Sequence, residues 1–135
     1  SHQKLSKAAL AGLVSLATVG AGEAKEYAAA ALHKMACSED GGTRAALAAS
    51  EAAMGFFAQL LTGSDAGHQV VSTSLLQLST EPRALEALVK LKGVAPLVAV
   101  ASSDSDPGAR RSAAMVLARL AKADAAAVAA TANSV

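Results

Sequence analysis

Apolar residues recur along the chain at an interval of 42 to 43 residues, with helical spacing inside each occurrence. The clearest set is Ala28, Leu32 and Met35, which returns as Val71, Leu75 and Leu78 and again as Ala113, Leu117 and Leu120. Positions three and four apart share one face of an α-helix, so each set predicts the buried seam of one helix. A fixed interval of this length is typical of a repeat protein.

A second apolar helix precedes each seam, and a turn separates the two helices. Leu13 and Leu16 correspond to Phe56 or Phe57 and Leu60, and then to Leu97 and Val100. The turns fall at residues 20–23, 63–67 and 102–108, which contain the glycines expected at such positions. In the last turn, Asp106 is a good N-cap and Pro107 suits the first position of the following helix.

Shorter helices are expected between these pairs, which makes a unit of three helices. Thr43 should cap one that runs from Arg44 towards Ala53, and residues 80–82 should open another. The second helix of each unit should begin near Gly12, Gly55 or Gly93. We therefore expect one all-α domain over residues 1–135, with repeats at about 1–41, 42–79 and 80–123. Repeat one lacks a clear first helix, and the Ala-rich residues 125–132 predict the first helix of a further unit within 124–135.

Composition supports a helical core and restricts the partners. Hydrophobic residues make up 53% of the 135 residues but aromatic residues only 2%, so helices must approach closely over alanine. With 12 basic and 11 acidic residues the net charge is +1, which gives no overall field to attract nucleic acid or an anionic membrane. The single cysteine, Cys37, excludes an internal disulfide, fits an intracellular, cytoplasmic setting, and is expected to be buried.

The N-terminal stretch imitates a secretory signal, because Lys4 and Lys7 precede the uncharged residues 8–22. The same stretch falls in register with the first helix of the repeat. It is also shorter than the ~20 apolar residues that a membrane span needs. We therefore expect a helix of the repeat there and no membrane segment.

Sequence motifs in the unit point to a family. The third repeat starts with K-G-V-A-P-L-V at 92–98 and finishes with M-V-L-A-R-L-A at 115–121. A-A-L-H-K-M-A at 30–36 and T-S-L-L-Q-L-S at 73–79 occupy the same finishing position. These motifs resemble the armadillo repeat over nearly the whole chain, with the related HEAT repeat as the alternative. The resemblance implies a right-handed α-α superhelix whose third helices line a concave groove that binds proteins or extended peptides without catalysis.

The resemblance also places nine residues on the groove side of the third helices, because residues four apart share a face. They are Glu26, Ala30 and Lys34; Gln69, Thr73 and Gln77; and Arg111, Met115 and Arg119. The two arginines can bind a carboxylate or phosphate, the glutamines can bind a peptide backbone, and Met115 either contacts the partner or fills the core. The importin-α branch of the family carries Trp and Asn where this chain has Ala30 and Lys34, Thr73 and Gln77, and Met115 and Arg119. This departure argues against basic import signals and favours acidic or phosphorylated partners, as in β-catenin-like grooves.

Other interpretations of the same residues remain open. Charged residues on a solvated helix face commonly serve solubility, so the arginines need not touch a ligand. The chain could be a structural segment of a longer solenoid, with self-association through its exposed ends. A helical-repeat surface could also bind nucleic acid, although the balanced charge and the lack of stacking aromatics argue against this.

No pattern in the sequence predicts catalysis, a cofactor, a metal site or a small-molecule substrate. T-V-G-A-G-E-A-K at 18–25 imitates a dinucleotide-binding loop, but Lys25 occupies the third glycine position and no strand precedes the run. His33 and His68 show no zinc spacing with Cys37, and His33 is expected to be exposed. Asp104 and Asp106 are explained by helix capping rather than by calcium. The sequence therefore predicts a binding scaffold and not an enzyme.

Overall fold

The computed structural model describes residues 2–63 and 67–133, and within them the regular structure is helical. The helices are α1 (His2–Val19), α2 (Gly22–Ala36), α3 (Gly41–Ala48), α4 (Glu51–Leu61), α5 (His68–Leu78), α6 (Pro82–Lys90), α7 (Val94–Ser103) and α8 (Pro107–Asn133). The expected all-α class is therefore confirmed.

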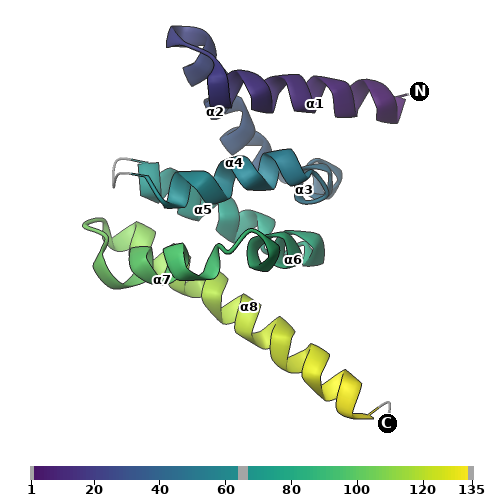
Figure 1. Cartoon of the computed structure of the whole chain (residues 1–135), viewed down its shortest axis with the longest axis vertical. Coiled ribbons are helices and arrows are strands. Elements are labelled where there is room, and N and C mark those ends of the chain that lie inside the picture. The colour runs from purple at the N-terminus through teal and green to yellow at the C-terminus, as the bar shows by residue number, and fades with distance from the viewer. Residues whose placement is uncertain (1, 64–66, 134–135) are drawn as a thin grey trace.

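The helices are arranged in three tiers, which Figure 1 shows from top to bottom as α1 with α2, then α3 to α5, then α6 to α8. Helices three apart in the chain are neighbours in space. Thus α1 contacts α4 and α4 contacts α7, α2 contacts α5 and α5 contacts α8, and α3 contacts α6. The repeated contacts have the same order as the repeated sequence, because equivalent helices bury equivalent apolar faces.

Helix α5 lies at the centre of the fold and contacts α2, α3, α4 and α8. Its seam residues Val71, Leu75 and Leu78 have no exposed surface. The equivalent seams on α2 and α8 are also in the core, although Met35 and Leu117 are only partly buried. The predicted seam of the third helix in each unit is therefore confirmed.

The buried face of α1 differs from the predicted one by one residue. Val14, Phe57 and Val100, which are successively 43 residues apart, are all buried, whereas Leu16 is 40% exposed. Helix α1 belongs to the end tier and packs mainly on α2 and α4, so much of its surface has no neighbour. Leu16, which the sequence pattern aligns with Leu60 and Val100, is therefore exposed.

Several predicted helix boundaries are also wrong. The short first helix of the second unit starts at Gly41 rather than Arg44, because the side chain of Asp40 accepts a hydrogen bond from the Gly42 N–H and acts as the N-cap. Ser50 then caps α4, so the expected helix towards Ala53 is two helices. Gly12 and Gly55 lie inside α1 and α4, and only Gly93 directly precedes its helix. The uncharged N-terminal stretch lies largely within α1.

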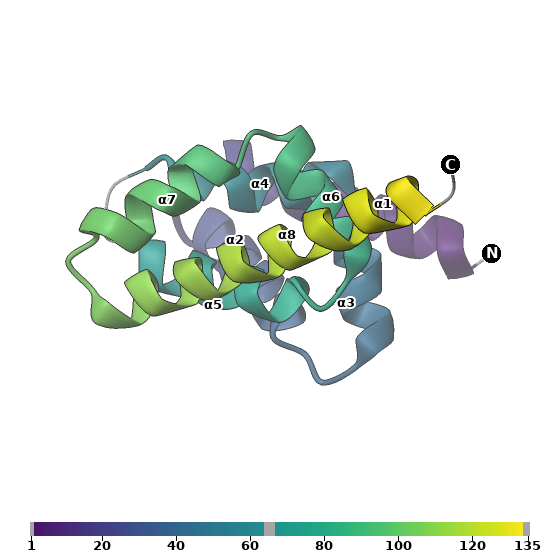
Figure 2. The same ribbon diagram turned by 90° about the horizontal axis from the view of Figure 1, so that it is seen from below.

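Helix α8 continues without interruption to Asn133, where a separate helix was expected after Asp124. Its C-terminal half extends beyond the three tiers (Figure 1), and in Figure 2, seen from below, α8 runs across the side of the molecule nearest the viewer. Between Leu120 and Asn133 the sequence contains neither Gly nor Pro and is rich in alanine. Because alanine is the best helix former, nothing local ends the helix.

The turn between α6 and α7 forms a Schellman motif with an unusual residue. The Gly93 N–H donates to the Leu88 carbonyl at 2.8 Å and the Lys92 N–H to the Val89 carbonyl at 3.0 Å. Lys92 takes the left-handed position that glycine usually occupies, with φ of 60°. The following glycine leaves room for this turn, since a Cβ at Gly93 would lie 3.1 Å from the Leu88 carbonyl oxygen, which is a tight contact.

Candidate protein-binding face

Helices α2, α5 and α8 lie side by side and present one common face, which we call the third-helix face. We define it by the nine residues Glu26, Ala30, Lys34, Gln69, Thr73, Gln77, Arg111, Met115 and Arg119. All are exposed except Thr73 and Arg119, which are half-buried. The seams on the opposite sides of these helices are buried, so helix amphipathicity fixes which residues face solvent.

Met115 is exposed, with 43% of its surface accessible. Of the two roles that the sequence left open for it, filling the core is therefore excluded. Its neighbour Val116 has no exposed surface and takes the core position instead. Met115 thus presents a flexible, polarisable apolar group to solvent or to a partner.

Arg119 has structural hydrogen bonds that the sequence did not predict. Its Nη1 atom donates to the Leu76 carbonyl oxygen at 2.8 Å and to the Ser79 hydroxyl oxygen at 2.5 Å. Both acceptors lie at the C-terminal end of α5, where helix carbonyls lack partners within the helix and the helix dipole favours a cation. Arg119 therefore ties α8 to α5, and much of its capacity to donate is used inside the fold.

The remaining cations of the face are Lys34 on α2 and Arg111 on α8. Neither forms an ion pair within the described part of the chain. Arg111 lies in the second turn of α8 and is exposed.

Sequence reasoning missed two apolar residues of the same surface. Tyr27 on α2 is 76% exposed and Val70 on α5 is 44% exposed. Tyr27 and Val70 are 43 residues apart, which is the repeat interval, so they occupy equivalent places in successive units. The repeat interval was therefore the signal that could have identified both residues. The pattern of every fourth residue, which defines the groove positions, does not include them.

A polar contact also joins α2 to α5, in addition to the Arg119 contact between α8 and α5. The Nδ1 atom of His33 lies 2.9 Å from the Ser74 hydroxyl oxygen, and the imidazole packs against the Phe57 ring with centroids 5.5 Å apart. This burial lowers the pKa of His33 and favours the neutral ring. The prediction that His33 is exposed is wrong, because Phe57 and Ser74 cover it from the next unit.

A buried polar cluster lies at the junction of the second and third units. The Nδ1 atom of His68 lies 2.5 Å from Asp104 Oδ2, and its Nε2 atom lies 3.0 Å from the Gly63 carbonyl oxygen. The other Asp104 oxygen accepts from the Asp106 N–H at 2.9 Å, and this bond, followed by the bond to His68, lowers the pKa of the Asp104 carboxyl. Asp104 therefore has a role beyond helix capping.

This cluster borders a hollow of about 280 Å³, whose lining includes Ser103 as well as His68 and Asp104. The three residue types are those of a hydrolase triad, but their geometry differs. The Ser103 hydroxyl donates to the Ala99 carbonyl oxygen, and the Nε2 atom of His68 lies by the Gly63 carbonyl oxygen. Within the described residues, Ser103 is therefore not paired with His68 as a nucleophile with its base.

Metal-ligating residues do not gather within the described residues, where no group of three His, Cys, Asp or Glu side chains could hold an ion. Cys37 is exposed, so the prediction that it is buried is wrong. It follows α2 directly as its C-cap, where the chain turns away from the core. In residues 2–63 and 67–133, no helix combines the length and the hydropathy needed to cross a bilayer.

Comparison of the chain with protein-family models, with curated proteins and with solved structures gave no match. The resemblance to the armadillo repeat therefore rests on the motifs and the periodicity of this chain alone. The arguments about function that follow use the third-helix face and its residues.

Proposed function

We propose that this chain is an armadillo-like solenoid segment that binds a protein or an extended peptide along the third-helix face. The observation that supports the proposal is the contact order α2, α5, α8, which aligns equivalent helices and leaves their polar sides open to solvent. In a right-handed armadillo superhelix, this face would line the concave groove. The chain then acts as a binding scaffold and not as an enzyme.

Charge on the face favours an acidic or phosphorylated segment. Lys34 and Arg111 are exposed at opposite ends of the face, and Arg111 can bind a carboxylate or phosphate with two parallel hydrogen bonds. Gln69 and Gln77 lie between them and can donate to or accept from a peptide backbone. Because these groups are exposed, binding should weaken as salt shortens the screening length to below ~8 Å.

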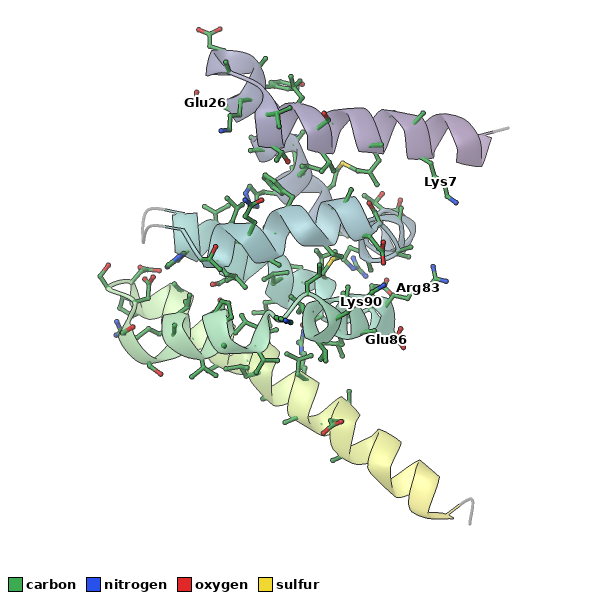
Figure 3. All side chains as sticks on the ribbon, viewed as in Figure 1. Lys7, Glu26, Arg83, Glu86 and Lys90 are labelled. Atoms are coloured by element: carbon green, nitrogen blue, oxygen red, sulfur yellow. The ribbon has the colours of Figure 1, made fainter. Side chains whose placement is uncertain are left out.

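The test is a peptide-display selection on the protein and on a Lys34→Glu, Arg111→Glu double variant. Arg119 is left unchanged because its substitution would disturb the contact with α5. A Lys7→Glu, Arg83→Glu double variant is the matched control, since it changes the net charge equally and both residues lie on the far side of the molecule from Glu26 (Figure 3). Far-ultraviolet circular dichroism checks that helicity is unchanged.

Enrichment of acidic sequences on the natural and control proteins, and its loss on the Lys34→Glu, Arg111→Glu variant, is the expected result. If the same sequences enrich on all three proteins, the third-helix face is not the binding surface and the proposal fails.

A purely structural role is the second candidate, favoured by one observation on α8. Ala114, Ala118 and Ala121 are exposed, yet they correspond to Ser72, Leu76 and Ser79 of α5, which are buried or half-buried. A further unit or a second copy stacked on α8 would cover them. Sedimentation equilibrium over a range of concentrations distinguishes a self-associating segment from a monomeric scaffold.

A further inference from the structure

The contact between the first and second units contains a titratable side chain. His33 on α2 is half-buried, and its ring centroid lies 5.5 Å from that of Phe57 and 6.1 Å from that of Phe56, both on α4. Its Nδ1 atom lies 2.9 Å from the hydroxyl oxygen of Ser74, a residue of α5 with no exposed surface. His33 therefore packs against two apolar rings and one neutral hydroxyl group, at the place where α2 meets the second unit.

The equivalent place between the second and third units is apolar. The repeat interval of 43 residues takes His33 to Leu76, and the interval of 42 residues takes Ser74 to Val116. Leu76 is partly buried against the core, and Val116 has no exposed surface. The same position of the repeat is thus polar at the first junction and apolar at the second. A change in pH therefore acts on the two junctions differently.

The helices around His33 place few charges near it. Helices α4 and α5 each carry one titratable side chain, Glu51 and His68, at their first residue. The residues of these helices that contact His33 come six or more positions later, except Phe56, which comes five positions after Glu51. Helix α1 is uncharged over residues 8–19, and α3 carries Arg44, whose guanidinium donates to a backbone carbonyl oxygen. The other titratable side chains of α2 and its C-cap are exposed, namely Glu23, Lys25, Glu26, Tyr27, Lys34 and Cys37.

Burial of the ring makes the strength of this contact depend on pH. It lowers the pKa of His33, which favours the neutral ring in the folded protein. A histidine of this kind contributes its full stability above the unfolded pKa of about 6.5, and this contribution is lost as pH falls from there through the folded pKa. Leu76 and Val116 take up no proton, so the second junction has no such dependence at this position.

We propose that His33 is a pH-sensitive latch between the first two units, whose protonation loosens α1 and α2 from α4 and α5 while the second and third units stay together. Helices α1 and α2 form an end tier (Figure 1), and an end unit of a repeat protein can open without the rest of the fold. Lys34 follows His33 on α2, so this opening also moves a cation of the third-helix face. The latch involves no ligand and does not depend on the proposed function.

Amide hydrogen exchange tests the latch at about pH 7.5 and about pH 5.5, on either side of the pKa of an unfolded histidine. Protection factors, which correct for the intrinsic effect of pH on exchange, are measured for the α2 amides around Leu32 and for the α8 amides around Val116. Protection of α2 should fall about threefold or more relative to that of α8 at the lower pH.

Two variants identify His33 as the source of this change. His33→Leu introduces the residue type found at the equivalent position 76, and His33→Asn keeps a polar side chain beside Ser74 without a group that titrates. In both variants the ratio of α2 to α8 protection should be the same at the two pH values. His68 is present in all three proteins, so it cannot account for a difference between them.

A constant ratio in the natural protein overturns the proposal, and so does a pH-dependent ratio that persists in both variants. Better protection of α2 at the lower pH also overturns it, because the faces of Phe56 and Phe57 would then stabilise the charged ring. If the ratio changes as expected but display selection enriches nothing, the latch stands and the proposed function fails. If the ratio is constant while acidic sequences still enrich, the latch is wrong and the proposed function stands.

Discussion

Replacing Leu75 by alanine tests whether α5 is the centre of the fold. Leu75 has no exposed surface, and its helix contacts α2, α3, α4 and α8. The change removes three carbon atoms, whose loss costs about 2.4 kcal/mol at ~0.8 kcal/mol each. The cavity left by the side chain adds to this cost. The His33–Ser74 and Arg119–Leu76 hydrogen bonds hold α2 and α8 on α5, so these helices cannot move far enough to fill it. We therefore expect a loss of about 3 to 4 kcal/mol in the free energy of unfolding.

Urea denaturation followed by circular dichroism measures this loss, and the melting temperature should fall by roughly 10 to 20 °C for a chain of this length. Leu16→Ala is the control, because the sequence pattern aligns Leu16 with the buried Val100 while the structure leaves it 40% exposed. It should cost less than about 1 kcal/mol. An unchanged denaturant slope confirms that unfolding stays cooperative, which repeat arrays do not always preserve. Equal losses for the two variants would refute the assigned packing.

Four further tests, which use six substitutions, examine local features. Lys92→Gly should stabilise the protein by about 1 kcal/mol in urea denaturation, because it relieves a positive φ. Gly93→Ala should destabilise the protein, because the new Cβ would be crowded by the Leu88 carbonyl oxygen. The opposite order of stabilities would contradict the turn geometry. Arg119→Ala should cost about 1 to 2 kcal/mol in the same assay, and Arg111→Ala should be nearly neutral. Because the pKa of Asp104 is lower in the folded protein, its stabilisation is complete above the unfolded pKa of about 3.9 and is lost as pH falls through the folded pKa. The stability of Asp104→Asn should therefore fall less steeply over this acid range, and an equally steep fall would exclude Asp104 as a source. Lys90→Ala should leave the melting temperature unchanged, since Lys90 and Glu51 form a pair that is mostly exposed.

The apolar periodicity predicted the helices and their seams well, because equivalent helices of successive units bury equivalent apolar residues. Leu32 and Leu75 were identified from spacing alone and are fully buried. Boundaries that depend on single caps were predicted less well. Ser50 stops one helix and starts another inside an alanine-rich run, and nothing in the periodicity marks it.

The polar contacts of the site could not be predicted from spacing. His68 and Asp104 are 36 residues apart and meet only because α4, α5 and α7 converge. Arg119 matched the face pattern, but its bond to α5 depends on how closely the two helices pack. Tyr27 and Val70 could have been found, since their separation equals the repeat interval.

The most direct test of the central claim is nuclear magnetic resonance mapping of the surface that a selected peptide contacts. Amide shifts of the uniformly labelled protein are followed during titration with the most enriched acidic peptide. We expect the perturbed amides to lie on α2, α5 and α8 around Lys34, Val70 and Arg111. Perturbation confined to α1, α4 and α7, or to the outer ends of the stack, would contradict the assignment of the third-helix face as the binding surface.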